Sequence, residues 1–247
     1  YIYMELTKSS NPAMGGFNRV SHSTSRSNVM TLEGTTQKIT LLLSLLLVFA
    51  YIGWTQISTA LLFPILIGTL IIGFVIAITL SFKPLWSPFL APVYAIVEGL
   101  FLGLVSSLYN SMYNGIVLQA IMLTLAVFVL MVVLYRNQII KVTEKFRSIM
   151  TLAIGAILIV YLISFVMGFF GSTIPQIHES GLIGIGFSLF VVTIAALSLL
   201  LDFDLIDKQI ANNQPKAMEW YGAFALLVTL VWLYFEILRL LAKLRNR

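Results

Sequence analysis

Four acidic residues lie within long apolar stretches of this chain or close such a stretch. Glu98 is near the middle of one stretch and Glu236 lies inside another, while Asp202 and Asp204 close a third. A carboxylate in hydrocarbon costs at least a few kcal/mol, so such residues mark ion paths, proton relays or gates. These four side chains are therefore the candidate functional residues.

Glu98 and Glu236 also have purely structural interpretations. Glu98 would be a neutral carboxyl that donates one hydrogen bond to a neighbouring helix. Glu236 would form an i, i+3 ion pair with Arg239 close to the membrane surface and anchor its helix there. Both interpretations stay open beside the functional ones.

The aspartates that end the third stretch have a similar alternative, because a solvated helix end would carry them equally well. There Asp207 would pair with Lys208, and Asp202 is the one expected to face the protein interior. The spacing Asp-x-Asp-x-x-Asp resembles a calcium loop, but the glycine turn and the distal Glu are missing. On a helix Asp202 and Asp204 point about 200° apart. Asp204 and Asp207 share a face and would hold a cation only loosely, so we predict no metal site.

Enzymatic and cofactor-binding patterns are largely absent from the sequence. The two histidines, His22 and His178, lie in polar segments, and neither a His-Glu-x-x-His motif nor a glycine-rich phosphate loop occurs. Without cysteine, thiolate metal sites and disulfides are excluded. The net charge of +5 comes from basic residues in short loops, which is not a nucleic-acid face. We therefore predict no enzyme, no cofactor and no nucleic-acid partner.

The elements that carry the candidate acids are transmembrane helices. The chain is 59% hydrophobic and 10% charged, whereas soluble domains are roughly 45–50% apolar. A run of about 20 apolar residues matches the hydrocarbon thickness and must be helical, so the fold class is an all-α polytopic membrane protein. We predict seven spans, at residues 39–55, 61–81, 89–108, 115–135, 149–170, 182–201 and 220–241.

Residues 1–37 differ from the rest, being rich in Ser, Asn, Thr and Gly and without periodicity. We predict a disordered cytoplasmic tail there, followed by a single membrane domain at 38–247. Within the third span, Gly99-x-x-x-Gly103 fits the close packing of two helices.

The basic residues indicate the orientation. The tail and the second, fourth and sixth loops hold 4, 1, 4 and 2 Lys and Arg, eleven in all, whereas the first, third and fifth loops hold none. The N-terminus is therefore expected in the cytoplasm. Seven spans then place the C-terminus outside, although the last four basic residues follow Glu236. Either the early helices dominate insertion, or the seventh segment is re-entrant.

Three motifs in order carry a resemblance to a known family. The third span reads Pro-Val-Tyr-Ala-Ile-Val-Glu-Gly over 92–99, the sixth ends in Leu-Asp-Phe-Asp-Leu-Ile over 201–206, and the last contains Leu-Tyr-Phe-Glu-Ile-Leu-Arg over 233–239. Together with the seven spans, these segments resemble the Bax inhibitor-1 family, and its bacterial YccA-like branch most. The resemblance covers about residues 38–244.

The resemblance implies six helices around a central seventh and a pH-sensitive calcium leak. It also implies two acidic residues, on the sixth and seventh helices, that share a proton and gate the pore. By motif these fall on Asp202 or Asp204 and on Glu236, with Glu98 lining or bracing the path. Two carboxyls in contact cannot both ionise cheaply, so such a pair titrates as a unit.

Three features depart from the family pattern. The seventh-helix acid is Glu rather than Asp, the interval between the two acids is longer, and the basic latch residue of the second helix has no counterpart. At about 1.5 Å per residue, Asp202 would lie about 14 Å and Glu236 about 28 Å from the connecting turn. Direct contact therefore needs a break in the seventh segment, for which Gly222 is the candidate position, or a large axial offset.

The leading functional prediction is a cation leak channel, with calcium as the expected ion and protonation of these carboxyls as the gate. The alternative is a membrane protein that restrains another membrane complex, such as a quality-control protease, through its Ser-rich tail. In both cases the chain is expected in the bilayer of a bacterial inner membrane. Sequence leaves the direction of flux, the oligomeric state and the partner open.

Overall fold

The computed structural model describes residues 28–55, 59–170 and 181–246. Seven long helices and one short 3-10 turn make up most of this part of the chain, in the order α1 (Leu32–Thr55), α2 (Thr59–Phe82), η3 (Pro84–Trp86), α3 (Ser87–Met112), α4 (Ile116–Arg136), α5 (Glu144–Phe169), α6 (Leu182–Ala211) and α7 (Met218–Arg245). All seven long helices have the length and composition to cross a membrane. The predicted fold class is confirmed.

The helix ends lie where local chemistry stops the helix. Pro84 follows Lys83 and starts the short turn η3 between α2 and α3. Gly115 adopts the left-handed conformation, φ 75°, directly before α4. At the start of α5 the hydroxyl of Thr143 accepts a hydrogen bond from the Phe146 amide at 3.2 Å. The breaks at Pro84 and Gly115 agree with the predicted spans, whereas α5 begins at Glu144, before the predicted start at 149.

Two boundaries differ most from the prediction. The helix α1 begins at Leu32, so residues 32–37, which were assigned to the tail, are helical. The helix α6 runs on to Ala211, well past the end predicted at 201. Polar residues extend both helices beyond the apolar core, where hydropathy alone gives no signal. Residues 1–27 lie outside the described part of the chain.

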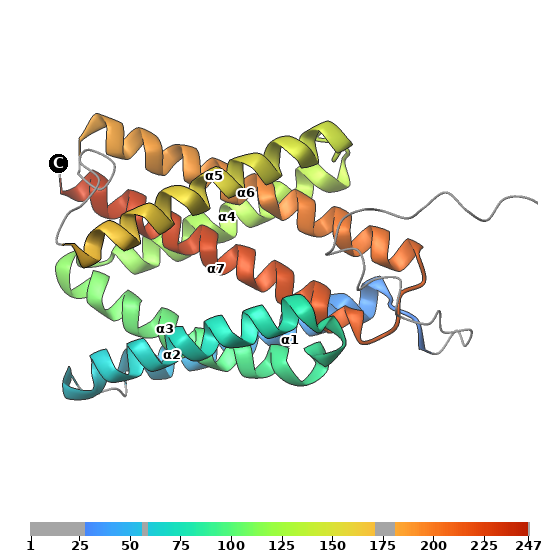
Figure 1. The fold of residues 1–247 in the computed structure, drawn as a ribbon, viewed down its shortest axis with the longest axis horizontal. Coiled ribbons are helices and arrows are strands. Elements are labelled where there is room, and N and C mark those ends of the chain that lie inside the picture. The colour runs from blue at the N-terminus through green and yellow to red at the C-terminus, as the bar shows by residue number, and fades with distance from the viewer. Residues whose placement is uncertain (1–27, 56–58, 171–180, 247) are drawn as a thin grey trace, which may run out of the picture.

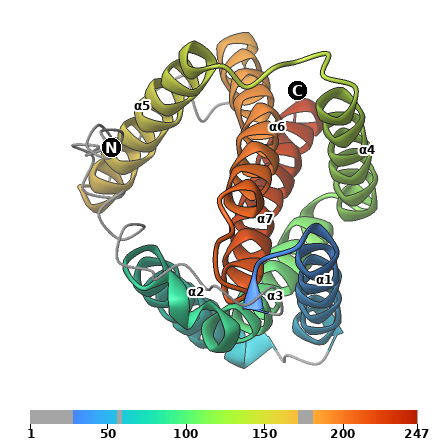
Figure 2. The ribbon, with the colours of Figure 1, turned by 90° about the vertical axis from the view of Figure 1, so that its right-hand side faces the viewer.

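The helix α7 runs through the middle of the bundle (Figures 1 and 2). It packs against α1, α3, α4 and α6 and has the largest buried share of the seven spans. The helix α2 packs against α3, and α5 packs against α6. The arrangement thus has a central seventh helix, as the resemblance implies, but α6 lies beside it in the middle.

The closest contact between helices joins α1 to α3 through the two glycines predicted for this purpose. A Cβ at Gly99 would lie 2.5 Å from the carbonyl oxygen of Leu46. A Cβ at Gly103 would collide with the backbone of Ala50. Only glycine permits this approach, and the close-packing interpretation of Gly-x-x-x-Gly is confirmed.

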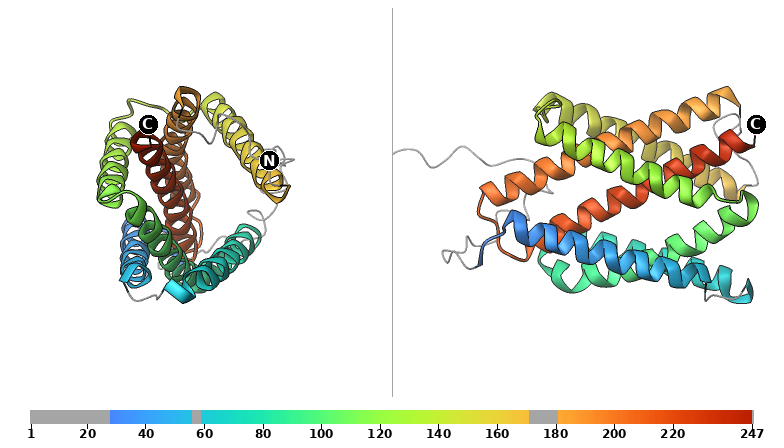
Figure 3. Two further views of the ribbon diagram at one scale, coloured as in Figure 1. Left: turned by 90° about the vertical axis from the view of Figure 1, so that its left-hand side faces the viewer. Right: turned by 180° about the vertical axis from the view of Figure 1, so that it is seen from behind.

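The two ends of the described chain lie at opposite ends of the bundle (Figure 3). Before α1, the Met30 amide donates to Gln214 O in the α6–α7 connection at 2.8 Å. At the other end, Arg245 donates from Nη1 to Asn114 O in the α3–α4 connection at 2.7 Å. We call these the N-terminal end and the C-terminal end.

The re-entrant alternative for the last segment is wrong. The helix α7 is continuous from Met218 to Arg245 and reaches the C-terminal end. Gly222, where a break was considered, instead lies against Ile206 of α6, whose Cγ1 would be 3.0 Å from an added Cβ. Glycine there serves helix packing, not a kink.

Candidate functional site

Asp202 points from α6 toward the central helix. The hydroxyl of Thr229 on α7 lies within hydrogen-bonding reach of its carboxyl, and the same hydroxyl donates to Ala225 O at 3.3 Å. The Oδ2 atom of Asp202 is buried and has no hydrogen-bond partner among the described residues. Of the three aspartates on α6, Asp202 is the one that faces the interior, as predicted.

Glu236 lies at the centre of a polar cluster between α5 and α7. Its Oε1 accepts hydrogen bonds from Tyr161 Oη at 2.9 Å and from Trp232 Nε1 at 3.2 Å. Arg239 donates from Nη1 to both carboxylate oxygens at 3.2 Å and to Tyr161 Oη at 2.6 Å. Glu236 is only 1% exposed. The predicted i, i+3 pair with Arg239 is therefore present and connects α7 to α5.

Asp204 faces away from Asp202 and pairs with basic side chains. Arg147 of α5 donates from Nη2 to Asp204 Oδ2, and Lys208 Nζ lies 3.0 Å from the same oxygen. Lys208 is also 3.9 Å from Glu144 Oε1. This ionic network ties α5 to α6 toward the N-terminal end.

The predicted pairing of Asp207 with Lys208 is wrong. Asp207 accepts a hydrogen bond from Tyr135 Oη of α4 at 2.7 Å, while Lys208 turns to Asp204. Consecutive helical residues diverge by about 100°, whereas residues four apart share a face, and this favours the observed partner.

Glu98 lies between α3 and α2. Its carboxyl is within hydrogen-bonding reach of Tyr94 on its own helix, and its Oε2 would be 3.2 Å from a Cβ added to Gly73 of α2. Tyr94 packs edge-on against Phe224 of α7, with ring centroids 5.0 Å apart. The hydroxyl beside Glu98 is thus that of Tyr94 on its own helix, whereas the structural interpretation expected a partner on a neighbouring helix.

The structure does not bring Asp202 and Glu236 together as one pair. Asp202 contacts Thr229, and Glu236 lies seven residues further along the unbroken α7, about 10 Å at a rise of about 1.5 Å per residue. The partners of Glu236 come from α5 and α7. The two acids are thus separate sites at different depths along the central helix.

Sequence reasoning missed Lys243, which is 7% exposed in α7. Its Nζ donates to Gly184 O at 3.0 Å and to Ser188 Oγ at 2.8 Å, both on α6. It stands among the basic residues of the C-terminus and was counted there as a loop charge. Its spacing of seven from Glu236, which gives both residues the same helix face, is the signal that could have revealed it.

Sequence reasoning also missed Glu219, which is 0% exposed at the start of α7. Its Oε1 accepts from Thr31 N at 3.1 Å and Thr31 Oγ1 at 3.0 Å, and its Oε2 lies 3.4 Å from Lys38 Nζ. A Cβ at Gly34 would collide with this carboxylate. The cluster fixes the start of α1 to the start of α7.

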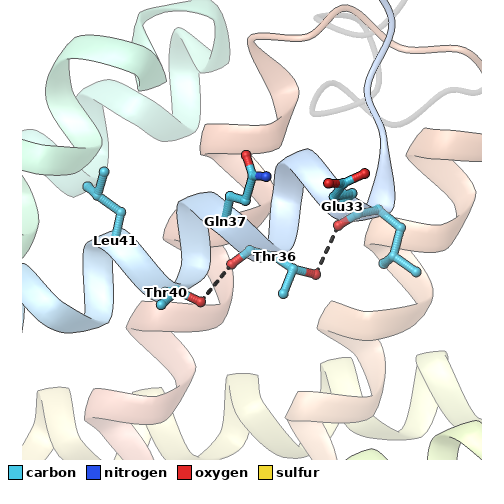
Figure 4. A pocket seen from close by; sticks show the side chains of 6 residues that line it. Glu33, Thr36, Gln37, Thr40 and Leu41 are labelled. Carbon is cyan, nitrogen blue, oxygen red and sulfur yellow. Dashed lines mark hydrogen bonds between the residues drawn. The ribbon is translucent and has the colours of Figure 1, made fainter.

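Two further features carry no site. No group of three potential metal-ligating side chains occurs among residues 28–55, 59–170 and 181–246. A surface hollow along α1 is lined by residues of that one helix, and Figure 4 shows that Thr36 and Thr40 donate their hydroxyl hydrogens to its own backbone. Groups from different elements do not converge there.

A comparison with protein families matches residues 8–246 to the family described as Bax inhibitor 1 like. The chain belongs to the Bax inhibitor 1 like family. A comparison with curated proteins finds no match. The family resemblance of the three motifs is therefore confirmed, while the YccA-like branch and the bacterial source stay predictions.

Within this Bax inhibitor 1 like protein the motif acids occupy distinct environments. Asp202 faces the central helix and has one oxygen without a hydrogen-bond partner among the described residues. Asp204 forms ion pairs with Arg147 and Lys208. Glu236 accepts hydrogen bonds from Arg239 and two further side chains.

Proposed function

We propose that the protein is a pH-sensitive cation leak channel, with calcium as the expected permeant ion and carboxyl groups of α6 and α7 as the gate. The observation that carries the proposal is the Asp202 carboxyl, which has a buried, unpartnered oxygen against the central helix. Membership of the Bax inhibitor 1 like family and the membrane-spanning helices support it.

Protonation of Asp202 favours the closed packing of α6 on α7. A neutral carboxyl can donate its hydroxyl hydrogen, and the nearby Thr229 oxygen, whose own hydrogen goes to Ala225 O, is the group proposed to accept it. An ionised carboxylate in hydrocarbon costs about 2.5–3.5 kcal/mol or more without a charge partner. Deprotonation therefore favours water entry between the two helices, and we expect flux to rise with pH.

Glu236 and Asp204 have different parts in this proposal. Arg239 balances the charge of Glu236, and the hydroxyl of Tyr161 joins both to α5. Arg147 and Lys208 balance Asp204 and hold α5 against α6. Movement of α6 relative to α7 would strain both sets of contacts, so they stabilise the closed state. Glu98 braces the path from α3.

The test is reconstitution into liposomes that contain a calcium dye, over a range of pH. Asp202→Asn should abolish most of the pH dependence, because the amide cannot ionise, and Glu236→Gln should shift it by leaving Arg239 without its counter-charge. The matched control is Asp207→Asn, which removes an exposed carboxylate from the same helix.

Flux whose pH profile is the same in Asp202→Asn and Glu236→Gln as in the unaltered protein would reject the gate. Absence of flux at every pH would instead favour the alternative function, restraint of another membrane complex. We further propose a bacterial plasma membrane as its location, with the N-terminal end in the cytoplasm, because the tail and the second, fourth and sixth loops together hold eleven of the 15 basic residues.

A further inference from the structure

A cavity of about 380 Å³ lies between α1, α3, α4 and the central helix α7. It falls within the size range of pockets that bind small ligands, about 300–1,000 Å³. Tyr234 and neighbouring residues of α7 line it. Glu236 is two residues from Tyr234 and therefore points to nearly the opposite face of the helix. The cavity is thus separate from the proposed gate.

The buried part of the cavity offers few hydrogen-bonding groups to a polar ligand. Its lining is almost entirely aliphatic and aromatic. Of its buried hydroxyls, Ser106 Oγ and Tyr234 Oη bond to each other at 2.7 Å, and Thr124 Oγ1 donates to Ala120 O at 2.8 Å. The other polar side-chain groups of the lining belong to Tyr51 and Trp54, which lie at the exposed rim. A polar ligand would lose its water contacts without compensation. The chemistry therefore selects a hydrocarbon.

The dimensions of the cavity match one leaflet of a bilayer. On α1 the lining runs from Leu43 to Trp54, and on α4 it runs from Val117 to Phe128. Each interval is eleven residues, about 16 Å of helix, and half of the hydrocarbon core is about 15 Å. Trp54 lies at the end of α1, where an aromatic ring meets the headgroups. The cavity therefore has the depth of a single acyl chain.

The mouth of the cavity is continuous with the lipid-facing surface. Leu47, Tyr51 and Leu125 line it and are also 58%, 70% and 54% exposed on helices that span the membrane. The floor is formed by buried residues, among them Leu102 and Val231. A chain of the surrounding bilayer has direct access from the rim to this floor.

From these features we propose that the cavity binds one acyl chain of a bilayer phospholipid, from the leaflet at the C-terminal end. The chain packs on Leu102 of α3 and Val231 of α7 and fills the space that side chains leave between α1 and α4. Its headgroup stays at the level of Trp54. The ligand class is a phospholipid with an ordinary hydrocarbon chain, held by shape and not by polar contacts.

The test uses the full chain in phosphatidylcholine vesicles that contain a phospholipid with a diazirine in its acyl chain. After irradiation, adducts are mapped by mass spectrometry. The proposal predicts adducts on Leu102 and Tyr234. Both residues are buried, so lipid that stays outside the cavity cannot reach them. Ile121→Trp fills the cavity from α4 and should remove these adducts. The matched control, Met122→Trp, enlarges the adjacent residue, which is 63% exposed and outside the cavity, and should keep them.

Adducts confined to exposed residues in the unaltered protein would overturn the proposal, and this measurement needs no variant to fold. The same result for Ile121→Trp and Met122→Trp, with floor adducts kept in both, would also overturn it. A second experiment replaces the phospholipid by a free fatty acid that carries the diazirine, so that the two sources of an acyl chain are compared. Labelling of the floor by the free acid but not by the phospholipid would contradict the assigned source.

Discussion

At the scale of single residues, Glu219 is the acidic side chain with the greatest structural consequence. It is fully buried and joins the start of α1 to α7 through Thr31 and Lys38. Replacing Glu219 by Gln keeps an acceptor for Thr31 but removes the charge opposite Lys38. We expect the free energy of unfolding to fall by about 1–3 kcal/mol, measured by equilibrium unfolding in mixed micelles.

Glu33→Gln is the control for this change. Glu33 is an exposed acid in the first turn of α1, two residues from Thr31, so the same chemical change removes no buried contact. Its effect should stay within about 0.5 kcal/mol. Equal effects of the two substitutions would show that the buried anchor contributes nothing beyond local charge.

At the scale of elements, the packing of α1 on α3 depends on the absence of side chains. Gly103→Ala would place a Cβ against the Ala50 backbone, which cannot yield as a flexible side chain can. We expect a loss of about 1–3 kcal/mol in the free energy of unfolding. Gly155→Ala on α5 makes the same change where an added Cβ meets nothing within 4 Å.

The Gly155 control should be neutral or should stabilise the protein by up to about 1 kcal/mol, because alanine has the higher helix propensity. Unfolding curves of both variants in the same detergent check the pair. A loss at Gly155 as large as at Gly103 would contradict the steric explanation and point to backbone flexibility instead.

The helix α5 differs from α1, because polar contacts add to a small apolar cluster in which Met150 and Ile157 pack against α6. It has the smallest buried share of the seven spans. Tyr161 connects it to Glu236 and Arg239, and Arg147 connects it to Asp204. In lipid there is little hydrophobic driving force between helices, so hydrogen bonds and ion pairs decide such attachments. This makes α5 the element most sensitive to the charge state of the candidate acids.

At the scale of the whole molecule, the fold was predictable because hydropathy reports the membrane directly. The seven spans, the central position of the last helix and the Gly99–Gly103 contact all follow from apolar runs, the family resemblance and small-residue spacing. The start of α1 and the end of α6 were missed, because polar residues extend helices that leave the hydrocarbon.

The candidate site was only partly predictable. The opposite orientation of Asp202 and Asp204 follows from helical geometry, and the contact of Glu236 with Arg239 follows from their spacing. The partners Arg147, Tyr161 and Thr229 depend on which helices become neighbours, and local sequence carries no information about that. For the same reason the absence of a direct Asp202–Glu236 contact needed the structure.

The structure shows what the basic residues near the C-terminus contact. The tail and the second, fourth and sixth loops, as counted in the sequence, hold eleven basic residues, and four more follow Glu236. Of those four, Arg239 pairs with Glu236, Lys243 donates to α6, and Arg245 donates to Asn114 O. The proposed cytoplasmic N-terminal end rests on the count of basic residues.

This orientation gives a direct prediction, since the chain contains no cysteine and single thiols can be introduced without background. Ser111 is exposed near the end of α3 at the C-terminal end, and Asn137 is exposed in the α4–α5 connection at the N-terminal end. In intact bacterial cells a membrane-impermeant maleimide should label Ser111→Cys, and should label Asn137→Cys only after permeabilisation. The reverse labelling pattern would show that the basic residues after Glu236, and not those in the loops, set the orientation. Labelling of both residues from outside would contradict a single membrane crossing, by α4, between Ser111 and Asn137.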